Sequence, residues 1–126
     1  MIGNLLYLTA SRPDLMQAVC ATNRFQVNLK ESHVLAVKRI LRYLKGTLEM
    51  GLWYPAMDSV KLQAYTDVDW AGSIDDRKST NGCSFYLDSK CVAWLSRKQN
   101  SVALSTAKVE YMAACAACIQ VIWMLR

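Results

Sequence analysis

In the first half of the chain, hydrophobic and polar residues recur with the spacing of amphipathic helices. Ser11, Pro13 and Asp14 form a typical helix start, because a hydroxyl can cap the first turn, proline fits there, and an acid favours the positive end of the helix dipole. We expect this helix to run for about three turns, to near Phe25.

A second helix is predicted after Asn28 and Glu31, which repeat the capping pattern, and Gly46 supplies its stop. Its apolar positions recur at helical spacing: Val34, Val37, Leu41 and Leu44. Its opposite side is basic: Lys38, Arg39, Arg42 and Lys45. A solvated charged face accounts for these cations, and a stripe that follows nucleic-acid phosphates is the alternative.

In the second half of the chain, the helical spacing of apolar residues gives way to short segments typical of strands. A loop marked by Pro55, Asp58 and Ser59 precedes predicted strands at 61–66, 82–87 and 91–96. The segment "LDSK" predicts a tight hairpin turn, and "GSIDDRKSTNG" predicts a longer polar loop. A last helix is predicted from the caps Ser105 and Thr106. We therefore expect an α+β protein with a three-stranded antiparallel sheet and a packed helix, preceded by two helices.

Composition narrows the class of protein. The chain has 126 residues, of which 53% are hydrophobic, and this is enough for a folded core. Its five cysteines are odd in number and scattered, which favours a reducing compartment over a secreted disulfide framework. The start lacks the basic residues of a secretory signal, and the apolar run 111–125 is predicted to be a buried helix rather than a membrane span. We expect an intracellular protein, cytoplasmic or nuclear, with no membrane partner.

Acidic residues occur where apolar neighbours predict burial. Asp67 and Asp69 end the first strand, and Glu110 is the one acid of the last helix. A carboxylate in an apolar core is costly unless it is paired, protonated or bound to a metal. If these elements pack together, the acids converge, and a divalent cation would relieve their repulsion. A plain strand-end acid and a partly exposed helix residue are the alternative interpretation.

Other candidates for chemistry are weaker. Cys115 and Cys118 form a CxxC without a second ligand pair, so buried thiols are expected rather than zinc ligands. His33 is interpreted as structural, and Trp70 and Trp94 are interpreted as core. No cofactor-binding motif is present: the chain has no glycine-rich phosphate loop.

Several motifs in order carry a family resemblance. The segments "AYTDVDWAG", "DDRKSTNG", "VAWLSRKQNSVALST" and "VEYMAA" resemble the ribonuclease H domain of copia-type retrotransposon Pol polyproteins. Upstream, "MIGNLLYLTASRPDLMQAV" and "ESHVLAVKRILRYLKGT" resemble the segment that joins the reverse transcriptase to that domain. The resemblance implies a helical connection segment over 1–58 and the N-terminal part of a ribonuclease H-like fold over 59–126.

The family's enzyme cuts the RNA strand of RNA–DNA hybrids with two Mg²⁺ ions held by carboxylates. By resemblance, Asp67 and Glu110 are the catalytic and metal-binding acids, and Asp69 supports them. Arg97 and Lys98 are candidates for contacts with backbone phosphates, although a solvated loop explains them equally. The implied partners are an RNA–DNA hybrid or other nucleic acid, bound weakly, and the rest of the Pol polyprotein.

Two departures from the family pattern argue against activity of this chain alone. Lys108 stands where the family has an acid, and it puts a positive charge in the first helical turn, close to the proposed cation site. The family also continues beyond the position of Arg126 into a strand with a further metal-binding aspartate. We expect an incomplete, inactive ribonuclease H. A noncatalytic nucleic-acid-binding or interaction module is the alternative, and a translated remnant without function is a third possibility.

Overall fold

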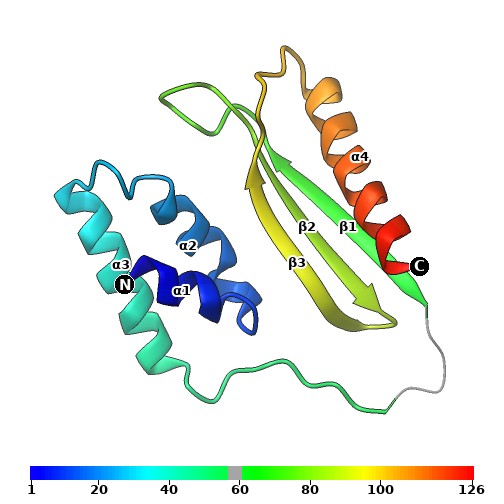
Figure 1. Ribbon diagram of the computed structural model, residues 1–126, viewed down its shortest axis with the longest axis horizontal. Coiled ribbons are helices and arrows are strands. Elements are labelled where there is room, and N and C mark those ends of the chain that lie inside the picture. Colours follow the sequence, from blue (N-terminus) through cyan, green and yellow to red (C-terminus); the bar gives the residue numbers. More distant parts are fainter. Residues whose placement is uncertain (57–60) are drawn as a thin grey trace. The chain divides into compact units, whose positions relative to one another are not determined.

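The computed structural model describes residues 1–56 and 61–126. The chain forms two compact units, Met1–Trp53 (unit 1) and Tyr54–Arg126 (unit 2). Figure 1 shows unit 1 as a group of helices and unit 2 as a sheet with one long helix. Pro55 lies outside any regular element, as predicted, whereas Asp58 and Ser59 fall outside the described residues.

Unit 1 is built from α1 (Ile2–Leu8), a single 3-10 turn (Pro13–Leu15), α2 (Met16–Asn23) and α3 (Glu31–Gly46). The predicted helices near 13–25 and 31–46 are confirmed. Helix α1 was not predicted, because its short apolar run shows no clear period. One apolar cluster joins all of these elements: Ile2, Leu5, Leu15, Val19, Val37 and Ile40.

The predicted caps of unit 1 are wrong in detail. The Ser11 hydroxyl donates to the Leu8 carbonyl, 3.2 Å away, and so closes α1 instead of opening the next helix. The residue that precedes α3 is Lys30, not Asn28. Its backbone N–H donates to Nδ1 of His33 at 3.1 Å, and the His33 ring stacks on Phe25 with centroids 4.3 Å apart. The structural interpretation of His33 is therefore confirmed.

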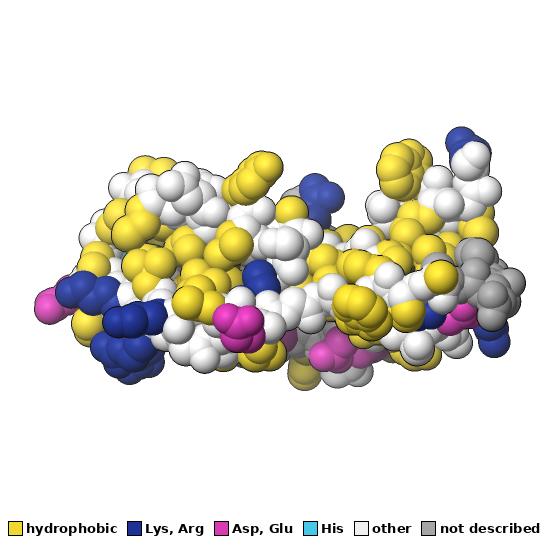
Figure 2. Space-filling view, turned by 90° about the horizontal axis from the view of Figure 1, so that it is seen from below, with side chains coloured by type: hydrophobic (Ala, Val, Ile, Leu, Met, Phe, Trp, Pro, Cys, Tyr) yellow, Lys and Arg dark blue, Asp and Glu magenta, His cyan; other side chains and the backbone are white. Residues whose placement is uncertain are grey.

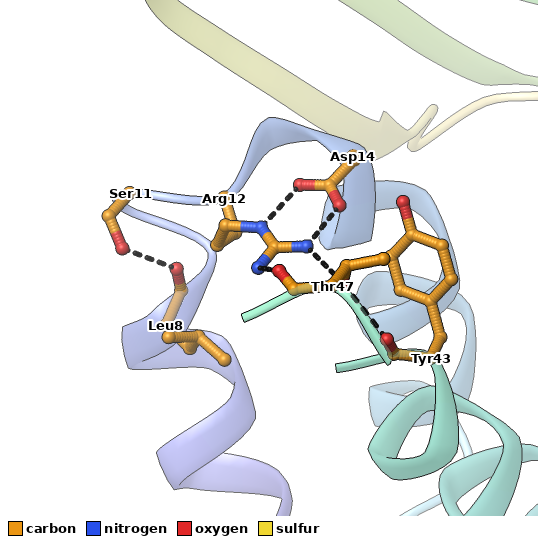
Figure 3. A network of polar contacts seen from close by, with 6 residues as sticks. All are labelled: Leu8, Ser11, Arg12, Asp14, Tyr43 and Thr47. Carbon is orange, nitrogen blue, oxygen red and sulfur yellow. Dashed lines mark hydrogen bonds and ion pairs between the residues drawn. The ribbon is translucent and has the colours of Figure 1, made fainter. Parts of the chain in front are cut away.

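A buried guanidinium ties the 3-10 turn before α2 to the residue that follows α3 (Figure 3). Arg12 is 7% exposed, and its Nε and Nη2 donate to the two carboxylate oxygens of Asp14 at 3.0 and 2.7 Å. Its Nη1 and Nη2 also donate to the carbonyl and hydroxyl oxygens of Thr47, at 3.0 and 2.8 Å. The Thr47 hydroxyl in turn donates to the Tyr43 carbonyl at 2.9 Å. Because nearly all of its donors are used, the guanidinium can be buried at low cost.

Unit 2 consists of β1 (Leu62–Asp69), β2 (Thr80–Leu87), β3 (Lys90–Lys98) and α4 (Thr106–Met124). The strands form an antiparallel sheet in the order β1-β2-β3, which confirms the predicted α+β class and sheet. The "LDSK" segment makes the tight hairpin, where Asp88 adopts a positive φ that aspartate tolerates better than most residues. The ribonuclease H-like fold stays a prediction.

Strict alternation along β2 decides which face of the sheet is covered. Asn81, Cys83 and Phe85 are buried, and the residues between them are only partly buried. Cys83 and Phe85 pack with Ala117 of α4. Along the helix, Val109, Ala113 and Ala117 recur every fourth residue and are the buried positions, so a stripe of small side chains lets α4 approach the sheet closely.

Helix α4 begins as predicted but is not buried as predicted. The Ser105 hydroxyl caps it by accepting the Lys108 N–H at 3.3 Å. Large apolar residues outside the buried stripe are exposed: Tyr111, Ile119, Ile122 and Trp123. By length and composition alone α4 would be long and apolar enough to cross a membrane, with 17% of the tested window buried, although no segment was expected to meet that criterion.

Replacing Thr47 with valine should destabilise unit 1. The change keeps the shape of the side chain but removes the oxygen that links Arg12 to Tyr43. We expect a loss of about 2 kcal/mol, because a hydrogen bond to a charged group is removed and a buried donor is left without its partner. Hydrogen exchange of the Val37 amide measures this loss, and the Phe85 amide in unit 2 is the internal control. Equal protection of Val37 in both proteins would contradict the role given to Thr47.

Candidate metal and nucleic-acid sites

The predicted acids lie at one end of unit 2. Asp69 is the last residue of β1, Asp67 lies two residues before it, and Glu110 lies in the N-terminal part of α4. In Figure 1 the arrowhead of β1 and the N-terminal half of α4 are at the same end of the sheet. We call this end, with Asp67, Asp69 and Glu110, the acid end.

Strand alternation separates the acids between two sides of the sheet. Thr66 pairs with Cys83, and the Cys83 Sγ lies 3.5 Å from the Thr66 hydroxyl, so Thr66 faces α4. Asp67 and Asp69 therefore lie on the other face, because successive side chains of a strand point in opposite directions. Glu110 is exposed on α4. The structure thus brings the three acids to one end of the sheet without placing them in one cluster.

The carboxylates themselves make short-range contacts. One oxygen of Asp67 accepts the N–H of Val68 at 2.8 Å. The Asp69 carboxylate lies against Gly72, so a Cβ at position 72 would make the Asp69 side chain turn away. The indole N–H of Trp70 donates to the Ala103 carbonyl at 3.4 Å, which joins the end of β1 to the segment before α4.

The donors at the acid end suit Mg²⁺ in type but not in number. Carboxylate oxygens are the ligands that Mg²⁺ prefers, and a loosely held ion keeps several waters. Over residues 1–56 and 61–126, however, no group of three or more His, Cys, Asp or Glu side chains is placed to hold a metal ion. Because Asp67 lies on the sheet face turned away from α4, which carries Glu110, the structure does not place the two carboxylates to hold one ion together. The sharing of one cation by Asp67 and Glu110 stays a prediction.

The loop between β1 and β2 is held by an ion pair. The Lys98 ammonium lies 2.7 Å from one carboxylate oxygen of Asp76 and donates to the Ser73 hydroxyl at 2.9 Å. The hydrogen bond from Lys98 keeps the pKa of the Asp76 carboxyl well below its usual range. Both predicted phosphate ligands lie within β3, where Arg97 is exposed and Lys98 is engaged by Asp76. Any phosphate would have to compete with Asp76 for Lys98.

The basic stripe of α3 is fully on the solvent side of unit 1. Val37 and Ile40 face the core of that unit. In Figure 2 Lys and Arg side chains gather at the end of the view that unit 1 occupies. The stripe comprises four exposed residues: Lys38, Arg39, Arg42 and Lys45. Both interpretations of it, a solvated face and a phosphate-binding surface, are compatible with this placement.

Some interpretations of individual side chains are wrong. Cys115 and Cys118 are exposed on α4, not buried, because only the face with the small side chains is covered by the sheet. Trp70 is 50% exposed and is not part of the core, since it follows the last residue of β1. Trp94, which was also interpreted as a core residue, is partly buried.

Two polar networks were not found from the sequence. Two of the four hydrogen bonds of Arg12 reach Thr47, 35 positions away, and no local pattern signals them. The buried amides of Gln99 and Asn81, whose side chains are joined by a 2.7 Å hydrogen bond, also depend on pairing between strands. A polar residue at a buried position of an alternating strand was the available signal at Asn81.

Comparison with known proteins shows clear relatives among curated sequences, whereas no protein-family model and no solved structure matches the chain. The retrovirus-related Pol polyprotein from transposon RE1 of Arabidopsis thaliana is 42% identical over 111 residues, which are 88% of this chain and 8% of that protein. The Pol polyprotein from transposon TNT 1-94 of Nicotiana tabacum is 42% identical over 126 residues, covering 99% of this chain and 9% of that protein.

A shorter relative is matched over most of its length. The protein named secreted RxLR effector protein 161, from Plasmopara viticola, is 41% identical over 124 residues, which are 98% of this chain and 87% of that protein. The similarities to the two transposon proteins define the class as retrovirus-related Pol polyproteins. More narrowly, the chain belongs to the Pol polyproteins of copia-type transposons, and it spans less than a tenth of those two polyproteins. The predicted family is confirmed.

The ion pair of the β1–β2 loop predicts a pH dependence. The folded-state pKa of Asp76 lies below its unfolded value, so the stabilisation is complete above the ordinary aspartate pKa of about 4 and is lost as the pH falls below it. Asp76→Asn should therefore lower the urea midpoint of unit 2 at pH 7, and its difference from the wild type should shrink below about pH 4. Asp75→Asn is the matched control, since Asp75 makes no ion pair among the described residues. A difference that stays constant with pH would contradict the assignment.

Proposed function

We propose that unit 2 is the beginning of a ribonuclease H-type domain, and that this chain alone binds nucleic acid weakly without cutting RNA–DNA hybrids. The observation that carries the proposal is the acid end: a copia-type Pol chain in which Asp67, Asp69 and Glu110 come to one end of a β-β-β-α unit. In ribonuclease H the corresponding acids bind the metal ions. An intracellular location follows from the same proposal.

The proposed roles of the acids follow from their chemistry. When bound, Mg²⁺ would stabilise the entering and leaving oxygens of the scissile phosphodiester. Asp67 and Glu110 are the proposed oxygen ligands for the ion. Because Asp67 lies on the sheet face turned away from α4, a shared ion would require at least one of the two side chains to turn toward the end of the sheet. Asp69 would support them from the same face of β1 as Asp67, because β1 stays extended through Asp69.

The proposed inactivity rests on the number of ligands. Two-ion hydrolysis needs several carboxylates in fixed positions, and the described residues contain no group of three candidate ligands. Lys108, two positions before Glu110 and exposed on α4, adds a positive charge near the acid end. Like charges in close proximity disfavour each other, so this lysine would weaken cation binding further.

The proposed nucleic-acid binding rests on unit 1. The cations of α3 are exposed along one helix and carry no acidic partner in an ion pair among the described residues. A row of such cations can neutralise successive phosphates and release their counterions. This stripe also supports the alternative function, a noncatalytic nucleic-acid-binding module, because it is independent of the acids.

A labelled RNA–DNA hybrid incubated over a series of Mg²⁺ concentrations tests the catalytic half of the proposal. We expect the wild-type chain to give no more cleavage than Asp67→Asn, because both lack the ligands for a second ion. A separate active ribonuclease H must cut the same hybrid as the positive control. Cleavage by the wild type that disappears in Asp67→Asn would overturn the proposed inactivity.

Salt dependence tests the binding half of the proposal. The double variant Lys38→Gln/Arg42→Gln should bind the hybrid more weakly, and the slope of log K against log salt should become shallower by about 0.9 for each phosphate that the variant no longer neutralises. The matched control is Lys61→Gln/Lys90→Gln, which removes the same charge from unit 2. Equal weakening in both variants, measured by fluorescence anisotropy, would mean that net charge and not the stripe binds nucleic acid.

A further inference from the structure

The side of α4 that faces away from the sheet carries a regular row of apolar side chains. The spacing along this row alternates between four and three positions: Tyr111, Cys115, Cys118, Ile122 and Leu125. We call these residues the seam. All of them are exposed, and the largest, Tyr111, Ile122 and Leu125, are 78%, 56% and 69% exposed. The two thiols belong to the row because free cysteine behaves as a small apolar side chain.

This spacing is that of a helix that packs along another helix. Apolar residues at the first and fourth places of a heptad repeat form the contact line of a coiled coil. The buried stripe of α4 lies on the other side of the helix and has a constant spacing of four: Val109, Ala113 and Ala117. Helix α4 therefore has two apolar sides, one covered by the sheet and one exposed.

The seam is neutral, so a surface that covers it has to be apolar as well. No charged residue lies between Tyr111 and Leu125. A second copy of the seam meets this requirement, because its apolar residues have the same spacing and a two-fold contact needs only a self-complementary surface.

The exposed area is enough for a pair of copies. Aromatic side chains bury roughly 150–250 Å² each, and aliphatic ones somewhat less. The seam, together with its neighbour Ile119, which is 64% exposed, therefore presents on the order of 500 Å² per copy. Two copies would bury about 1,000 Å² in total, which is at the lower limit of specific interfaces. We therefore expect a weak dimer whose population depends on concentration.

Lys108 distinguishes the two possible orientations of such a pair. It is exposed and continues the repeat, three positions before Tyr111. In a parallel pair the two Lys108 ammonium groups would lie side by side and repel each other. In an antiparallel pair Lys108 lies beside the C-terminal end of the other helix, where the helix dipole is negative and favours a cation. The charge that is unfavourable at the start of its own helix is favourable in that position.

We propose that two copies of the chain form a dimer through the seam of α4, with the two helices antiparallel. The register that overlaps the whole seam places Cys115 of each copy opposite Cys118 of the other. Tyr111 then lies opposite Ile122. The inference is independent of the proposed function, because the seam contains none of the acids of the acid end and none of the cations of α3.

Sedimentation of the full chain over a series of concentrations tests the dimer. The wild type should change from monomer to dimer as the concentration rises. Ile122→Lys should raise the dimer Kd at least about tenfold, because it places an unpaired charge in the buried contact. Leu104→Lys is the matched control: Leu104 is 88% exposed and precedes α4 outside the seam, so the Kd should not change. Equal weakening in both variants, or a wild type that stays monomeric up to about 1 mM, would overturn the inference.

Cysteine cross-linking tests the orientation. In a background with Cys20→Ser and Cys91→Ser, where Cys83 is buried, the variants Cys115→Ser and Cys118→Ser each keep one seam thiol. Diamide oxidises two thiols to one disulfide and takes up their two protons and two electrons. A mixture of the two variants should cross-link much faster than either variant alone, because a disulfide needs Cα atoms within about 7 Å. Faster cross-linking of each variant with itself would mean a parallel pair and overturn the proposed orientation.

A lipid surface is another possible occupant of the seam, since α4 is long and apolar enough to cross a membrane. Flotation of the wild type with phosphatidylcholine vesicles distinguishes it from the dimer. A monomeric wild type that floats with the vesicles, and an Ile122→Lys variant that does not, would make the seam a membrane-binding surface and overturn the inference. A monomeric wild type that does not float would assign the seam to a different protein segment and overturn it equally.

Discussion

The alternation of side chains along β2 is the constraint on which unit 2 depends. Its buried positions, Cys83 and Phe85, provide the surface on which Ala117 of α4 packs. Because β2 is the central strand, the same alternation determines the facing of both neighbours through their register. A shift of one residue in the pairing of β1 would carry Asp67 to the side of α4 and Thr66 to the other side.

This alternation explains why the three acids reach one end of the sheet without forming one cluster. Sheet topology requires the end of β1 and the start of α4 to lie together, since β3 delivers the chain to α4 at that end. It does not require the carboxylates to point at each other. The hydrogen bonds from Gln99 to Asn81 and Val109 instead fix how β2 meets the first turns of α4, because hydrogen bonds have defined lengths and directions.

The sequence predicted those features that depend on local periodicity. The extent of helix α3 and the hairpin between β2 and β3 were predicted. The apolar face of α3 was predicted only in part, because Val37 and Ile40 are the buried positions and Val34 and Leu41 are exposed. Features that depend on partners far along the chain were missed. The cap assigned to Ser11 failed because the hydroxyl is used by the preceding helix, which had no recognisable period. Helix α4 is apolar on all sides, and sequence alone cannot indicate that only one side is covered. For the candidate site, the sequence predicted which acids are present. The side of the sheet on which each one lies could be known only from the pairing of the strands.

The two loops of the sheet differ in length, and this has a consequence for the order of folding. The turn at Asp88 and Ser89 closes β2 onto β3 at little entropic cost, and such hairpins form in roughly 1–10 μs. Strand β1 must instead close the longer connection 70–79, whose Ala71 and Arg77 both adopt positive φ. The strand that carries Asp67 and Asp69 is therefore expected to join a preformed hairpin, and to be the first strand to detach when unit 2 opens. The acids would then belong to the kinetically least persistent part of the sheet.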